Sequence, residues 1–137
     1  MGTFTGLYIS CAFKKDLPEK VIEVLQYLFD EKGDDSTSEP KELPEHEFFT
    51  LPNWQLIGGC SSYYHTPMAT SYLWFDAENS GRYYLTSRSD LKDYDNEIEA
   101  FMEWIMPYIR EDDQFIGFVK AENSEPSLIY YGKDFSY

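Results

Sequence analysis

The sequence predicts an α+β fold, a curved antiparallel sheet of about six to seven strands with two helices packed on it. Two observations predict this class. Apolar residues alternate in seven short runs, as in strands with one buried face, and recur at helical spacing in two longer segments. With 137 residues, 25 of them aromatic, the chain can build a hydrophobic core. We therefore expect a single domain over residues 1–137, in the order β-α-β-β-β-β-α-β-β.

The first strand and the first helix have the clearest patterns. Residues 3–13 (TFTGLYISCAF) alternate, and Cys11 lies in register with the apolar positions, which predicts a buried free thiol. Apolar residues then recur at helical spacing, and Pro18 suits a first helical turn. We expect a helix over about 17–31.

The middle of the chain combines a polar segment with short β-rich runs. Residues 32–45 (KGDDSTSEPKELPE) are rich in acids, serines and prolines, which predicts a flexible acidic loop. Four predicted strands of a meander follow, and Asn79-Ser80-Gly81 between the last two indicates a hairpin turn. These strands cover residues 46–51, 54–64, 70–77 and 82–89.

The last part of the chain predicts a helix and two strands. Asp95 is a suitable helix cap, and the apolar positions that follow cover one broad helix face. Pro107 lies inside this pattern and should kink or shorten the helix. Residues 114–122 and 127–132 then alternate as strands.

The negative charge of the chain is localised. The formal net charge is −14, and 17 of the 25 Asp and Glu residues lie in residues 30–47 and 90–113. In the second helix Asp95, Glu99 and Glu103 are four apart, which places neighbouring carboxylates about 6 Å from each other on one face. Phosphates recur along a DNA strand at comparable intervals. The row therefore predicts a surface for a Lys- and Arg-rich partner, and a solvated helix face is the simpler alternative.

The candidate partner-binding residues come from both acidic stretches. The acidic loop could wrap a basic groove or serve only solubility. We assign the candidate site to six acids, Asp93, Asp95, Glu99 and Glu103 around the second helix and Asp34 and Asp35 in the loop.

The sequence does not predict a catalytic, metal or cofactor site. An EF-hand loop beginning at Asp93 would have Ile98 where Gly is required and Trp104 where the bidentate Glu belongs. Residues 61–65 (SSYYH) combine hydroxyls with an imidazole, but adjacency alone gives no nucleophile and base geometry, and a strand end with a turn is the simpler interpretation. The phosphate-binding, dinucleotide-binding and hydrolase motifs are missing from the sequence.

Charge and hydropathy also bear on partners and location. The basic residues are scattered, so the overall field should repel nucleic acid, and we expect no direct nucleic-acid binding. No apolar run has the length of a membrane span, and the first residues lack a signal-peptide pattern, so we expect a cytoplasmic protein without a membrane partner.

A family resemblance lies in the last part of the chain. Residues 91–109 (LKDYDNEIEAFMEWIMPYI) and 115–132 (FIGFVKAENSEPSLIYYG) resemble a pattern in small uncharacterised acidic proteins of bacteria, phages and mobile elements. The resemblance covers roughly the last 50 residues. It implies no activity and no site residues, but it suggests a mobile-element setting, in which small acidic proteins often inhibit host defence enzymes.

These observations favour a non-enzymatic inhibitor or decoy. Its expected partner is the basic surface of a nucleic-acid-handling host protein, such as a nuclease of a restriction or CRISPR-type system. An immunity protein or antitoxin that neutralises a basic toxin is the alternative. A small-ligand binder or enzyme is the third, and it would need a concave pocket near His65 or the tyrosines. The sequence does not determine the oligomeric state.

Overall fold

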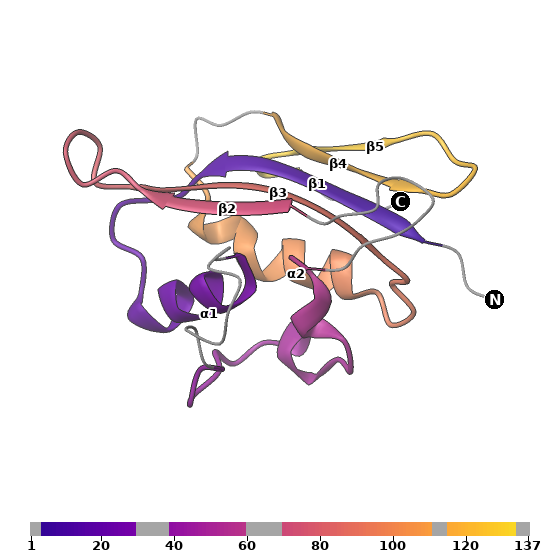
Figure 1. Cartoon of the computed structure of the whole chain (residues 1–137), viewed down its shortest axis with the longest axis horizontal. Helices are drawn as coiled ribbons and strands as arrows, with labels where there is room; N and C mark the ends of the chain where they lie inside the picture. Colours follow the sequence, from indigo (N-terminus) through magenta and orange to yellow (C-terminus); the bar gives the residue numbers. More distant parts are fainter. Residues whose placement is uncertain (1–3, 30–38, 60–69, 111–114, 134–137) are drawn as a thin grey trace.

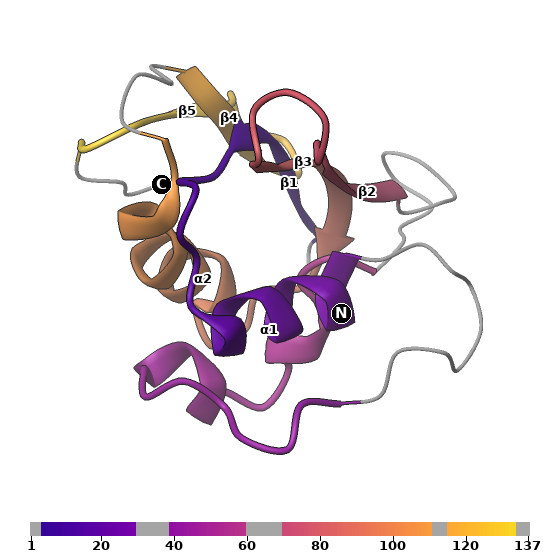
Figure 2. The same cartoon turned by 90° about the vertical axis from the view of Figure 1, so that its left-hand side faces the viewer.

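The computed structural model describes residues 4–29, 39–59, 70–110 and 115–133. It confirms the α+β class, with one open antiparallel sheet of five strands and two α-helices. Both helices lie on the same face of the sheet (Figures 1 and 2). The segment 39–59 packs against the helices, and its end reaches the sheet, where Leu56 and Gly58 accept hydrogen bonds from the hydroxyls of Ser89 and Ser71. The opposite face of the sheet carries no helix in the described ranges (Figure 1).

The sheet is built around its first strand. β1 (Thr5–Ala12) pairs antiparallel with both β3 (Tyr83–Leu91) and β4 (Phe115–Ala121), and the strand order is β2-β3-β1-β4-β5. β1 and β2 (Thr70–Phe75) are parallel to each other, since each is antiparallel to β3 between them. Strands β1 to β4 and the two helices thus form a split βαβ arrangement, and β5 (Ser127–Tyr130) extends it at one edge.

The alternating pattern of β1 decides which face of the sheet meets the helices. Leu7, Ile9 and Cys11 are buried on the helix side, so the expected burial of the Cys11 thiol is confirmed. Tyr8 and Ser10 point to the uncovered face because successive side chains alternate.

The two helices supply most of the opposing core. α1 (Glu19–Phe29) buries Val21, Val24 and Leu25 at helical spacing, within the range that the sequence predicts. α2 (Glu97–Ile105) buries Ile98 and Phe101 in the same way. The α2 helix ends where Pro107 enters a short 3₁₀ turn, η3 (Met106–Tyr108), so the predicted shortening is confirmed.

The prediction of strands at 46–51 and 54–64 is wrong for the described residues. They form two short 3₁₀ helices instead, η1 (Glu47–Thr50) and η2 (Trp54–Leu56), and this reduces the predicted six to seven strands to five. Phe48 and Trp54 are buried in an aromatic cluster with Phe101 and Trp104 of α2. Their aromatic side chains are typical of strands, but here they pack against α2 rather than pair in the sheet.

The predicted hairpin at Asn79-Ser80-Gly81 is present, and β4 and β5 also pair antiparallel. β2 and β3 are joined across residues 76–82, where the carboxylate of Asp76 accepts the backbone N–H groups of Asn79 and Ser80. These hydrogen bonds, that of Ser80 first, lower the pKa of Asp76. Gly81 has a φ of 67°, which glycine adopts without strain. Residues 39–45 form no helix or strand, and the rest of the predicted acidic loop lies outside the described residues.

Candidate functional site

The loop before α2 is held by its own acids. Asp93 has a φ of 52°, and its Oδ1 accepts the backbone N–H of Ile98 at 3.0 Å. Glu97 is fully buried, and its Oε1 accepts the N–H of Asp95 at 3.1 Å. Two carboxylates therefore satisfy backbone donors at the start of the helix, where such donors lack intrahelical partners.

The charge of this loop is not neutralised locally. Burial raises the pKa of Asp93 to about 6, against the hydrogen bond from Ile98, and the nearby carboxylates of Glu97 and Glu99 raise it further. In the described part of the chain, Asp95 and Glu99 form no ion pair with Lys or Arg. The start of α2 is a region of repulsion between like charges.

The structure brings the two acidic stretches of the sequence together. His46 Nε2, just before η1, lies 3.7 Å from Oε1 of Glu103 on α2. Exposed acids flank this contact on both segments, and we call them together the acidic surface. Its residues are Glu45, Glu47, Asp95, Glu99 and Glu103.

The predicted site residues are placed as follows. Asp95, Glu99 and Glu103 are exposed, as predicted. The row within the helix is shorter than predicted, because α2 begins at Glu97 after an Asn96 cap, which leaves Asp95 in the preceding loop. Asp93 is half-buried and anchors the helix start. Two further predicted site residues, Asp34 and Asp35, lie outside the described residues, as does the segment 61–65 with Ser62 and His65.

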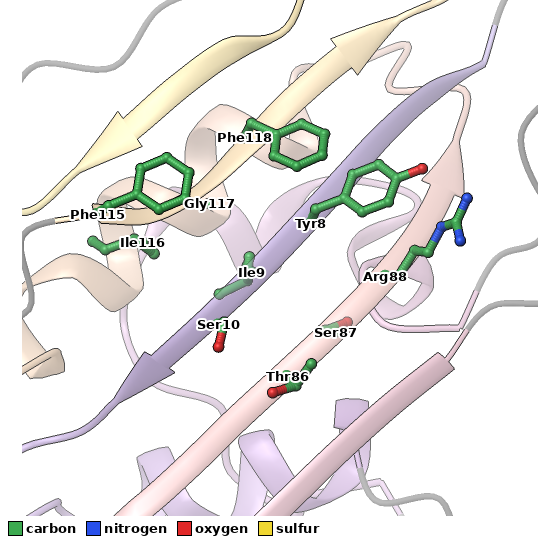
Figure 3. Close-up of a pocket in the computed structure, with 10 residues that line it drawn as sticks. All are labelled: Tyr8, Ile9, Ser10, Thr86, Ser87, Arg88, Phe115, Ile116, Gly117 and Phe118. Atoms are coloured by element: carbon green, nitrogen blue, oxygen red, sulfur yellow. The ribbon is translucent and has the colours of Figure 1, made fainter.

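Sequence reasoning missed a second site, on the uncovered sheet face. Phe118, Tyr8 and Arg88 lie directly opposite one another on β4, β1 and β3. The rings of Phe118 and Tyr8 stack with 4.4 Å between centroids and 12° between planes, and the Arg88 guanidinium lies 4.9 Å from the Tyr8 centroid. Figure 3 shows these three side chains as a row across the sheet, and we call them the aromatic row.

A depression of about 530 Å³ lies beside the aromatic row. Its floor is low because Ser10 and Thr86, which are paired on β1 and β3, have small side chains (Figure 3). Phe115, which is 52% exposed, stands at its β4 side. The β1 and β4 backbones are close here, since a Cβ on Gly117 would lie 1.9 Å from the Tyr8 carbonyl oxygen. We call this feature the sheet depression.

The alternation of β1 and β3 was the signal that could have revealed the aromatic row. It places tyrosines and an arginine on the outward positions of central strands, where a solvated face would normally carry small polar residues. The depression also needs the register of three strands that are far apart in the sequence, and no local pattern supplies that register.

Neither the arrangement of possible metal ligands nor the comparison with known proteins assigns a function to this chain. In residues 4–29, 39–59, 70–110 and 115–133, no three His, Cys, Asp or Glu side chains come together as metal ligands. None of the helices in these ranges is both long and apolar enough to cross a lipid bilayer. No protein-family model, curated protein or solved structure matches this chain.

Proposed function

We propose that this protein is a non-enzymatic inhibitor that binds the basic surface of a nucleic-acid-handling protein, such as a nuclease, through its acidic surface. One observation carries the proposal. Two acidic stretches that are about 50 residues apart in the sequence meet at the contact between His46 and Glu103 and form one exposed surface. Fixed carboxylates on a helix present negative charge without the entropy loss of ordering a loop.

The cost of this arrangement supports a role for the charge. Like charges at helical spacing destabilise a helix by a few tenths of a kcal/mol per pair. Burial is the main cause of the raised pKa of Asp93, and the nearby carboxylates of Glu97 and Glu99 raise it further. A structural surface alone would be more stable with Lys at some of these positions. A binding surface gains from keeping the acids, because complementary charge speeds encounter with a basic partner.

The first experiment compares two charge reversals of equal size. Glu99→Lys with Glu103→Lys changes the acidic surface, and Glu19→Lys with Glu23→Lys changes exposed positions of α1 at the same spacing. Each double variant moves the formal net charge from −14 to −10, because each Glu→Lys change adds two charges. We expect the first to slow partner association more than about tenfold and the second less than about threefold, since steering depends on charge near the contact.

The measurement is capture of partners from host lysate on immobilised protein, followed by association kinetics with the purified partner. A basic nucleic-acid-binding protein should be retained by wild type and by the α1 variant, lost from the α2 variant and displaced by duplex DNA. Equal retention by both variants, or partners without a nucleic-acid site, would contradict the proposal. An immunity protein would instead retain a single toxin whether or not DNA is present.

A further inference from the structure

The sheet depression has the size and the walls of a small-molecule site. Its volume of about 530 Å³ lies within the usual range of roughly 300–1,000 Å³ for ligand pockets. Phe115, Phe118 and Tyr8 provide aromatic surface, and the hydroxyls of Ser10 and Thr86 provide a polar floor. Apolar walls with a few polar groups are typical of sites that bind a flat organic molecule.

The charge at the depression comes from Arg88. Its Nε is buried without a hydrogen-bond partner, and within the described residues its guanidinium forms no ion pair and contacts the Tyr8 ring. A ligand with an anionic group would supply a counter-charge to the guanidinium.

Among the described residues that line the depression, Arg88 is the only charged one. One carboxylate lies near it on the same face, because Asp90 is two residues farther along β3 and its Oδ1 lies beside Gly6 and the Tyr8 ring. Most residues of the acidic surface belong to α2 and the segment 39–59, on the other side of the sheet (Figure 1). At physiological salt, exposed charges beyond about 8 Å are largely screened. The positive charge at the depression itself therefore comes from Arg88.

The stacking of the aromatic row distinguishes this site from a nucleic-acid platform. Single-stranded nucleic acids bind open sheets by stacking bases on exposed aromatic faces. Here the faces of Tyr8 are occupied by Phe118 and by Arg88. The ring edges and the depression beside them remain accessible, and they accommodate one ring system.

From these observations we infer that the sheet depression binds a small aromatic anion, a flat ring system with one carboxylate or phosphate group. The ring lies over Ser10 and Thr86 and makes edge-to-face contacts with the aromatic row. The anionic group accepts hydrogen bonds from Arg88. This site is separate from the acidic surface and does not depend on the proposed inhibitor function.

The test uses three probes that share one ring. The ¹⁵N-labelled full chain is titrated with 1-naphthoate, 1-naphthyl phosphate and the neutral 1-naphthamide while backbone amide shifts are recorded. We expect amides around the depression on β1, β3 and β4 to shift with at least one anion, with a dissociation constant of about 1 mM or below for a ligand of this size. The amide probe should bind at least about fivefold more weakly, because it lacks a charge-assisted hydrogen bond.

Variants separate the role of Arg88 from the role of the cavity. Arg88→Gln should lower the affinity for the anionic probes at least about fivefold and change the affinity for naphthamide less than about twofold. Lys92→Gln is the matched control, because it removes one positive charge near Tyr94 and Phe4, outside the depression. Ser10→Phe should abolish binding of all three probes by filling the cavity. If Ser10→Phe does not fold by thermal melting, Thr86→Tyr at the exposed partner position replaces it.

Three results would overturn the inference. Equal affinity for naphthamide and both anions would exclude a role for the Arg88 charge. Shifts outside the sheet depression, or no shifts at about 10 mM probe, would exclude the site. Amides of the uncovered sheet face that shift with protein concentration alone would show that a second copy of the chain occupies this surface.

Discussion

At the scale of single residues, Asp93 shows how a half-buried charge can oppose stability. Its carboxylate is held half-buried by the N–H of Ile98, and burial with neighbouring acids raises its pKa to about 6. Between the ordinary value of 3.8 and about 6, the folded chain binds more protons at this site than the unfolded chain. The contribution of Asp93 to stability is therefore highest at low pH and is lost as the pH rises through this window.

Asp93→Asn should remove this dependence. The Asn side chain can still accept the Ile98 N–H, and Asn tolerates a positive φ. At pH 7 we expect the variant to be more stable by about 1 kcal/mol, after allowance for solvent screening, and to lose the advantage at about pH 4. Denaturant unfolding of both proteins across this range measures the difference. The raised pKa of Asp93 would not explain the effect if the two proteins differed in free energy of unfolding by the same amount at pH 4 and pH 7. An equal effect of Asp95→Asn would contradict it as well.

At the scale of elements, the sequence predicts periodic segments well and aromatic connections poorly. β1, α1, the β2–β3 hairpin, α2 and the β4–β5 hairpin all follow from apolar spacing and turn residues. Phe48 and Trp54 have the side chains of strand residues, but tertiary packing against α2 determines their 3₁₀ conformation. The sheet depression could not be predicted, because Ser10, Thr86 and Gly117 are ordinary residues until strand pairing brings them together.

Phe48→Ala should therefore affect the core and not a sheet edge. Phe48 is fully buried against Phe101 and Trp104, so its truncation should lower the free energy of unfolding by about 3–5 kcal/mol. Leu56→Ala, in the neighbouring 3₁₀ helix, is the control, because Leu56 is 42% exposed and its loss should reduce stability by less than about 1 kcal/mol. Chemical denaturation of the two variants provides the comparison. Similar values for both would mean that η1 is not part of the core.

At the scale of the whole molecule, charge and apolar surface are separated. Most of the acidic surface lies on α2 and the segment 39–59. The uncovered sheet face carries the exposed side chains of Tyr72 and Trp74, which are paired with Thr86 and Tyr84 of β3, and that of Phe115 (Figure 3). With a formal net charge of −14, repulsion among acids destabilises the compact state. Salt also screens the ion pair of Lys20 and Glu42, but this pair is exposed and contributes little to stability. We therefore expect the screening of repulsion to have the larger effect.

The melting temperature should consequently rise with salt. Between about 0.02 and 0.5 M NaCl we expect an increase of about 3–6 °C, equivalent to roughly 1 kcal/mol for a chain of this length. The double variant Glu99→Lys with Glu103→Lys should show a smaller rise, because it replaces two negative charges of α2 with two positive ones. Scanning calorimetry at several salt concentrations checks both. A melting temperature that falls with salt would show that attractive ion pairs dominate.

Most of the acidic surface and the sheet depression lie on opposite sides of the sheet in the described part of the chain. A cationic matrix attracts the acidic surface before contact, because opposite charges attract over a distance. If the acidic surface determines how the protein adsorbs, the sheet depression faces away from the matrix and Arg88 stays within reach of solutes.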